Sequence, residues 1–591
     1  MNFKKINKLI PLLILIPAII LAMDNTSIIT KINLRVTGEN VENDAFPGNS
    51  GVSVNQQFSE KKLDDAIKSL NNTFYKQGFL FAKTEKMEKV YSDDSSQVEL
   101  NIRIDKGPQV NFGTITIKSD AIKTAYYENL LSSFTDKPYS EELLEENINR
   151  MLILAADSGY VFAQANVGKI NIRNTDDQVV ADLPIHILEG DRITIDEIEI
   201  NGNSYTRENV ILRELPLKKG DYYSKTIVDE IPQRLLKLNI FSDVKTPAIA
   251  LTRKNKFILS VGVEEGNATT FDGVVGYIPE NTSSTSGSSG FFTGLVDISF
   301  RNLFGTARSF DVHWEKPDRD SENFFLRYTE PWLLNYPIDV SVGLERTVRD
   351  STYIEWKGNL RNRWRYNHNF AIITALERQV VLPDSAANKD LRLVRYAQTN
   401  FEIGMEYDTR DYPINPRRGV FFSNSYTFGY KENFGPGYLL QEDSIKVNES
   451  IEILKVGFKW FHELFRNQVF ALQMTGNQVK GDRLQITDYI WFGGARTLRG
   501  YRENQFRGNI AAWMNLEYRF LLSRNSRIFA FNDWGVYSFK RNNLNVQEIL
   551  PGYGIGIRLN TGLGILAVDF GLGKGDGFSQ GKIHFGILNR F

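Results

Sequence analysis

Few residues of this chain have the type and spacing that catalysis requires. The segment Gly577-Phe578-Ser579-Gln580-Gly581 fits the Gly-x-Ser-x-Gly pattern of a serine nucleophile, but that nucleophile stands on a turn from a strand into a helix. Here a strand-like alternating segment follows, so we interpret Ser579 as part of a loop between strands. The glycine-rich stretch 571–577 also lacks a following helix and is not expected to cradle a phosphate. No catalytic residue is predicted.

Metal and thiol chemistry are equally unsupported by the sequence. The chain has no cysteine, which excludes disulfides, thiolate zinc sites and cysteine nucleophiles. Its histidines are scattered and include no pair four residues apart. We therefore expect no metal site, no cofactor and no enzymatic activity. The histidines are His186, His313, His368, His462 and His584.

Length and charge say little about partners but predict several domains. The chain has 591 residues, more than one hydrophobic core usually organises. Lys and Arg number 70 against 71 Asp and Glu. This balance removes the simplest argument for a nucleic-acid partner, and none is expected.

Residues 1–22 have the form of a secretory signal peptide. Lysines precede an apolar run, and the small residue Ala22 stands near the plausible cleavage point. A membrane anchor is the alternative, but Pro11 and Pro17 interrupt a run that is already short for a membrane-spanning helix of ~20 residues. Downstream there is no run of ~18 apolar residues, so a membrane protein with this sequence would have to be a closed barrel.

The segment up to residue 266 contains a pattern that recurs about every 80 residues. Each copy has a short strand, an amphipathic helix, and strands that end in a polar glycine turn. Ser59, Ser140 and Ser224 precede the three helices and are predicted N-caps. Pro232 lies inside the third helix, which is therefore expected to kink or to begin late. The pattern predicts three small α+β domains, at residues 24–107, 108–190 and 191–266.

From residue 267 to 591 the period changes to strict alternation. Between residues 510 and 520 the even positions are apolar and the odd positions are mostly polar or small. Alternating segments of ~10 residues separated by turns are typical of a transmembrane β-barrel. Soluble sandwiches and lipocalin-like barrels also alternate, but ~320 residues of alternation, abundant aromatic residues and an export signal favour the membrane barrel. At ~20 residues per strand and connection, about 16 strands are expected.

Several motifs resemble those of the BamA/TamA superfamily of outer-membrane assembly proteins. Segment 491–501 is similar to the family's lumen-loop motif, which has two glycines followed by a hydrophobic-Arg-Gly-aromatic tetrad. The resemblance implies a membrane β-barrel of about 16 antiparallel strands preceded by three small α+β POTRA-type domains. Three repeats match the TamA arrangement better than the five of BamA or the two of two-partner secretion transporters. Shorter matches follow in family order at 301–305, 328–332, 408–413, 416–419 and 569–571.

The resemblance also implies that the loop bearing Arg499 folds back into the barrel lumen. A guanidinium in a confined site must be paired, because an unpaired buried charge is costly. The family strand that receives this arginine looks like segment 531–535, where Asp533 would accept a charge-assisted hydrogen bond and Phe531 would offer its ring. For the bare Arg-Gly-Tyr tripeptide, an ordinary surface loop is the alternative. The predicted lumen-loop motif is Gly493, Gly494, Leu498, Arg499, Gly500 and Tyr501.

These features predict a protein that inserts or translocates other proteins at the Gram-negative outer membrane, with its POTRA-type domains in the periplasm. The expected working edge is the seam between the first barrel strand, about 269–277, and the last, about 581–591. Gly581 and Gly586 would weaken the last strand, and Phe591 matches the terminal aromatic residue of many such barrels. A client strand would pair with the edge of the first strand by β-augmentation.

Three kinds of partner are expected from this interpretation. They are the outer-membrane bilayer, unfolded client outer-membrane proteins, and a periplasm-spanning protein of the TamB-like type. A dedicated two-partner-type secretion transporter and a passive outer-membrane pore are the alternative functions.

Overall fold

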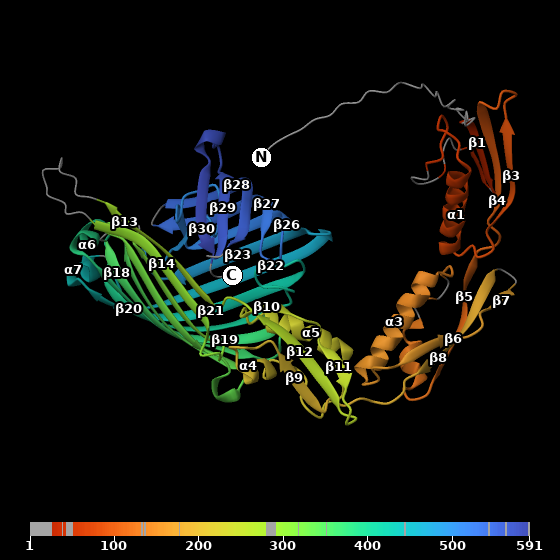
Figure 1. Ribbon diagram of the computed structural model, residues 1–591. Helices are drawn as coiled ribbons and strands as arrows, with labels where there is room; N and C mark the ends of the chain where they lie inside the picture. Colours follow the sequence, from red (N-terminus) through yellow and green to blue (C-terminus); the bar gives the residue numbers. More distant parts are fainter. Residues whose placement is uncertain are drawn as a thin grey trace, which may run out of the picture. The chain divides into compact units, whose positions relative to one another are not determined.

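The structure, a computed structural model, describes residues 27–37, 39–42, 46, 51–131, 134, 137–175, 178–278, 291–316, 318–349, 352–442, 445–541, 544–561 and 564–588. The predicted signal peptide and Phe591 lie outside these residues. The chain divides into two compact units (Figure 1). One is Met1–Ile193 with Tyr222–Lys225, and the other is Thr194–Asp221 with Thr226–Phe591.

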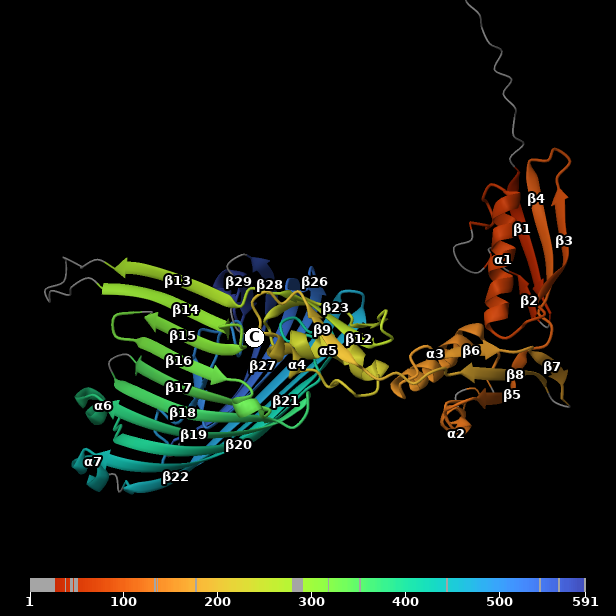
Figure 2. The same cartoon turned by 60° about the horizontal axis from the view of Figure 1, so that its bottom comes forward.

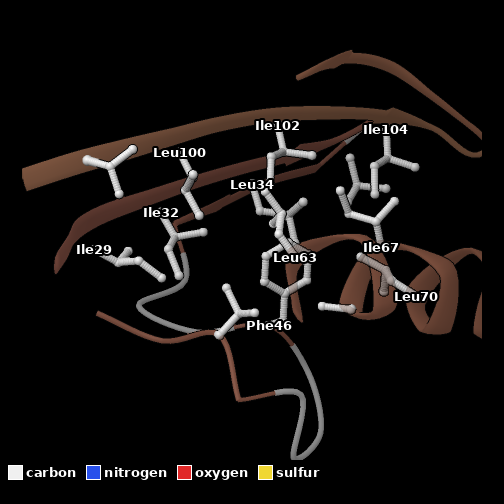
Figure 3. Packing of buried hydrophobic residues seen from close by; sticks show 14 of the residues in the cluster. Ile29, Ile32, Leu34, Phe46, Leu63, Ile67, Leu70, Leu100, Ile102 and Ile104 are labelled. Atoms are coloured by element: carbon white, nitrogen blue, oxygen red, sulfur yellow. The ribbon is translucent and has the colours of Figure 1, made fainter. Parts of the chain in front are cut away.

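The first small domain is a four-stranded sheet with one helix packed on one face. Strand order is β2-β1-β4-β3, and β1 runs parallel to β4. The helix α1 buries Leu63, Ile67 and Leu70 against Leu100 and Ile102 of the sheet (Figure 3). Fully burying an aliphatic side chain of this size contributes ~1.5–3 kcal/mol, so this cluster explains why the domain folds. The elements are β1 (Ile28–Val36), β2 (Glu39–Glu42), α1 (Glu60–Lys76), β3 (Lys83–Tyr91) and β4 (Gln97–Asp105).

The second and third small domains repeat this plan. In each, the last long strand runs parallel to the first, as β8 does with β5 and β12 does with β9. The second domain contains β5 (Val110–Ser119), α2 (Thr124–Glu128), α3 (Glu141–Asp157), β6 (Gln164–Val167), β7 (Asn171–Asn174) and β8 (Val179–Leu188). The third contains β9 (Glu197–Asn201), α4 (Glu208–Leu212), α5 (Lys225–Leu236), β10 (Phe241–Val244), β11 (Ala248–Leu251) and β12 (Phe257–Glu265).

The three predicted N-cap serines behave differently. Ser140 accepts a hydrogen bond from the Leu143 amide at 3.3 Å, as predicted. Ser59 occupies the N-cap position, but its hydroxyl makes no cap hydrogen bond, so that prediction is wrong in detail. The Ser224 hydroxyl donates to Asp157 at 2.9 Å. For the third helix a kink or a late start was expected, and the late start is excluded, because α5 begins at Lys225 and continues through Pro232.

Beyond residue 268 the described residues form an antiparallel sheet of sixteen strands that curls into a barrel, which confirms the predicted fold class (Figure 2). Every strand pairs with its sequence neighbour except that β23 pairs with β26. Among the described residues, no helix is both long and apolar enough to cross a membrane. The strands are β13 (Thr269–Ile278), β14 (Phe291–Leu303), β15 (Arg308–Lys316), β16 (Glu322–Glu330), β17 (Ile338–Arg349), β18 (Tyr353–Arg365), β19 (Phe370–Pro383), β20 (Arg395–Asp408), β21 (Gly419–Gly435), β22 (Asn448–Phe465), β23 (Gln468–Gly481), β26 (Ile510–Leu521), β27 (Arg527–Arg541), β28 (Leu544–Thr561), β29 (Gly564–Leu572) and β30 (Lys582–Leu588).

Alternation along the strands separates an apolar outside from a polar inside. In β26, Tyr518 and Phe520 are exposed, whereas Glu517 and Arg519 between them are buried. Successive side chains of a strand point to opposite faces of the sheet, so the charged residues line the interior. An apolar outer face is the one that hydrocarbon would cover.

The third small domain is held against the turns at one end of the barrel. Glu214 accepts hydrogen bonds from Arg365 at 2.7 Å and from the Trp332 indole at 2.6 Å. The Lys237 ammonium donates to the Asp408 carbonyl at 2.7 Å. Glu214 follows α4 and Lys237 follows α5, so the segments just after both helices of the domain take part.

Candidate functional site

A long segment, 482–509, connects β23 to β26 and contains the short hairpin of β24 (Ile490–Phe492) and β25 (Phe506–Gly508). Phe492 and Leu498 of this lumen loop are fully buried. Phe492 stacks on Trp513 of β26, with ring centroids 5.9 Å apart and planes 6° apart. The loop is therefore packed against the wall of the barrel rather than exposed.

Arg499 is bound on three sides by residues of the barrel wall. Its Nε and one terminal nitrogen donate to the two oxygens of Asp533 at 2.8 and 2.7 Å, and its other terminal nitrogen donates to Glu517 at 2.6 Å. The guanidinium carbon lies 3.9 Å from the ring centroid of Phe531. Arg499 is 3% exposed and Asp533 0%. A planar guanidinium bound at both edges and on one face has little freedom to rotate.

Strand register explains how four side chains of β26 and β27 come together around Arg499. In the β26–β27 ladder, Glu517 lies opposite Phe531 and Asn515 lies opposite Asp533. Residues two positions apart in a strand share a face, so all four side chains lie on the inner face of the sheet. Asn515 adds a hydrogen bond from its amide to the Thr497 carbonyl at 2.9 Å.

Glu517 was not identified as a partner from the sequence. It bonds Arg499 with one oxygen and Arg519 with the other, the latter at 2.8 Å. Arg499 and Arg519 thus form a buried cluster with the carboxylates of Glu517 and Asp533. In the sequence, Glu517 is recognisable only as a charged residue at an inward position of an alternating segment. That signal does not identify its partner.

Glycines allow the loop to approach the backbone of the wall. Gly500 has φ +90°, and a Cβ there would lie 2.6 Å from the backbone of Leu572. A Cβ at Gly552 would lie 2.2 Å from the Arg499 carbonyl oxygen. A side chain at either position would displace the loop. Gly552 was also not identified from the sequence, because a glycine is needed there only for the contact between the wall and the loop.

The remaining motif residues shape the loop around Arg499. Gly493 and Gly494 have φ of +116° and +97°, which L side chains rarely adopt. The Tyr501 hydroxyl donates to the Pro551 carbonyl at 2.8 Å and accepts from the Lys574 amide at 3.0 Å. The contacts of Tyr501 join the loop to β28 and to the segment that follows β29.

The predicted seam residues lie at the end of the sheet. β13 and β30 are its two end strands, and within the described residues no ladder joins them. Gly586 lies in β30, whereas Gly581 precedes that strand by one residue and ends the short helix η3 (Phe578–Gln580). Ser579 lies in η3 and is followed by β30, so it does not stand on the strand-to-helix turn of a nucleophile elbow.

Comparison with known proteins supports the superfamily that the sequence motifs resemble. Residues 302–591 match the Omp85 superfamily domain, and residues 193–266 match POTRA, described as the surface antigen variable number repeat. The chain belongs to the BamA/Omp85 superfamily.

Individual relatives are distant. The outer membrane protein assembly factor BamA of Neisseria meningitidis is 23% identical over 283 residues, which are 47% of this chain and 34% of that protein. BamA of Nitratidesulfovibrio vulgaris is 22% identical over 550 residues, 86% of this chain and 65% of that protein. The chain thus spans between a third and two thirds of the length of these relatives. Among solved structures, CdiB from Escherichia coli aligns with a TM-score of 0.46 at 14% identity, covering 86% of this chain and 94% of CdiB.

Proposed function

We propose that this chain is an assembly or translocation factor that inserts or exports client proteins at the outer membrane, and that it is not an enzyme. The barrel lies in the outer membrane and the POTRA-type region lies in the periplasm. The observation that carries the proposal is the lumen loop, whose Arg499 is bound by Asp533, Glu517 and Phe531 inside the barrel. A passive pore needs only a polar lumen, whereas this chain also has a POTRA repeat before its barrel.

In this proposal, clients enter the membrane at the seam between β13 and β30. β13 and β30 are the end strands of the sheet, so each has a backbone edge that a client strand could pair with by β-augmentation. Gly586 lies in β30, and no described atom lies within 4 Å of the place that a Cβ would take there, which is consistent with weak packing at that edge. Phe591 is assigned to the same terminal segment.

We assign residues 24–107, 108–190 and 191–266 to three POTRA-type domains that handle unfolded outer-membrane clients. The assignment to the TamA branch, and with it a TamB-like periplasm-spanning partner, rests on this repeat count. The named relatives are BamA proteins, so the TamA branch stays a prediction.

The lumen loop is tested with Arg499→Ala. We expect the variant to keep a folded barrel, seen as heat-dependent mobility in detergent gels, and to lose most of its activity in restoring outer-membrane protein levels to depleted cells. Arg502→Ala is the matched control, because Arg502 lies in the same loop and is exposed. Wild-type activity in Arg499→Ala would refute the role of the loop.

Depletion followed by an outer-membrane proteome separates the three functions. Loss of many barrel proteins supports the assembly role, loss of one exported protein indicates a dedicated secretion transporter, and loss of solute uptake alone indicates a pore. A disulfide between cysteines placed in β13 and β30 should abolish activity. An active crosslinked protein would contradict the seam.

A further inference from the structure

The lumen loop is held at a second place, on a different part of the barrel wall. The ammonium of Lys431, in β21, donates to both carboxylate oxygens of Asp488 in the loop, at 2.7 and 2.6 Å. The Lys431 and Asp488 side chains are 1% and 3% exposed. An ion pair so fully removed from water persists only where its geometry and its hydrogen bonds compensate for the lost hydration.

Neighbouring groups complete this pair. The Lys431 ammonium lies 4.1 Å from the ring centroid of Tyr396, which is completely buried. The Tyr396 hydroxyl donates to Thr487 at 2.9 Å. Asp488 also accepts the backbone amide of Gln485 at 2.7 Å. The carboxylate therefore fixes both a lysine of the wall and the turn that precedes it in the loop.

The two anchors of the loop lie on different strands. Lys431 stands in the β20–β21–β22 part of the sheet, opposite Gln398 and Glu449. Asp533 lies in β27, and β22, β23 and β26 separate that strand from β21. Asp488 and Arg499 are eleven positions apart in the sequence. The loop is thus bound by one ion pair near its beginning and by another near its middle.

The first part of the loop has packed side chains on one side and a cavity on the other. Ile486 packs against a small buried cluster that includes Tyr353 and Tyr396. The same segment, with Leu484 and Gln485, also borders a cavity of about 570 Å³. A side chain next to such a partly open cavity lacks protein contacts on that side, so the cavity offers room for movement once the ion pair is lost.

We propose that Lys431 and Asp488 form a second latch of the lumen loop, which positions residues 482–489 independently of Arg499. Neutralising either member frees this segment to move into the adjoining cavity while Arg499 stays bound to Asp533 and Glu517. The positioning itself is a property of the isolated protein. Its importance for client assembly rests on the function proposed above.

The absence of cysteine from the chain makes the latch measurable. A single Ile486→Cys reporter is labelled with a maleimide in the purified full-length protein in detergent micelles. We expect Lys431→Met to label at least ten times faster than the parent, because the segment loses its ionic anchor. Asp488→Asn, which keeps the shape of the side chain, should behave in the same way. Lys480→Met is the matched control, since Lys480 is an exposed lysine of the neighbouring wall, and should leave the rate unchanged.

Rescue separates positioning from general stability. Lys431→Arg and the exchanged pair Lys431→Asp with Asp488→Lys both restore an ion pair, so both should return labelling towards the parent rate. Unchanged labelling in Lys431→Met and Asp488→Asn, with the barrel folded by heat-dependent mobility, would overturn the latch. Faster labelling that leaves outer-membrane protein levels unaltered in cells would support the latch and contradict the proposed assembly role of the loop.

Discussion

The first small domain and the barrel interior bury opposite kinds of side chain to the same degree. Leu63 and Leu100 in the first domain are 0% exposed, and so is Asp533 in the barrel, next to Arg499 at 3%. Apolar burial is non-directional, so many combinations of aliphatic residues could fill the domain core. Ion pairs need one particular partner in one geometry. The fold of the domain is therefore specified by its pattern of apolar residues. The interior of the barrel is specified by individual ion pairs.

The largest effect should follow from placing a charge in the apolar core. In Leu100→Asp a carboxylate would be buried in β4 without a partner, a cost comparable with the ~5 kcal/mol that holds a small domain together. We expect the first domain to unfold and become sensitive to limited proteolysis, while the barrel keeps its heat-dependent mobility.

Arg103→Asp provides the control for that variant, because Arg103 lies in the same strand but is exposed. It should stay resistant to protease. A protease-resistant first domain in Leu100→Asp would show that the core does not decide its folding.

The converse change removes a charge from the barrel interior. Glu517→Leu places in the barrel interior an aliphatic side chain like those of the domain core. It also leaves Arg499 and Arg519 with one carboxylate fewer. Removing one member of a buried ion cluster typically costs ~3–5 kcal/mol. We expect faster proteolysis within the lumen loop and a lower temperature for conversion to the unfolded gel form.

Phe520→Leu is the matched control for Glu517→Leu, since Phe520 lies in the same strand with its side chain on the apolar outer face. It should change neither measurement appreciably. An equally resistant loop in Glu517→Leu would mean that packing of Phe492 and Leu498, and not charge, holds the loop in place.

The same contrast explains what could be predicted from the sequence. Period and length sufficed for sixteen strands and for the helices behind Ser59, Ser140 and Ser224, because a repeated pattern survives errors at single positions. Pairing is different. Glu517 meets Arg499 only through the register of β26 and β27, and Lys431 meets Asp488 across 57 residues. Neither pair has a periodic signal, and Asp533 was proposed only because a family motif supplied it.

Glu265 offers the mildest test, because it is a partly exposed charged group at the end of β12 in the third domain. Its carboxylate accepts hydrogen bonds from the Ser204 hydroxyl at 2.6 Å and from the amides of Tyr205 and Thr206 at 3.1 and 2.5 Å. Burial opposes ionisation, but these hydrogen bonds outweigh it and lower the pKa of Glu265 from 4.5 to about 2. A carboxyl group whose pKa is depressed by folding contributes stability above its unfolded pKa and loses that contribution as the pH falls towards its folded pKa.

We therefore expect the turn at residues 204–206 to lose protection from amide hydrogen exchange as the pH falls from about 4.5 to about 2, after correction for the intrinsic exchange rate. Glu265→Gln should lower protection at neutral pH by ~1 kcal/mol, since its acceptor is partly exposed to solvent, and should remove most of the pH dependence. If the variant kept the full dependence, another carboxyl group would be responsible. Individual polar contacts would then determine the structure of the small domains at more positions than Glu265.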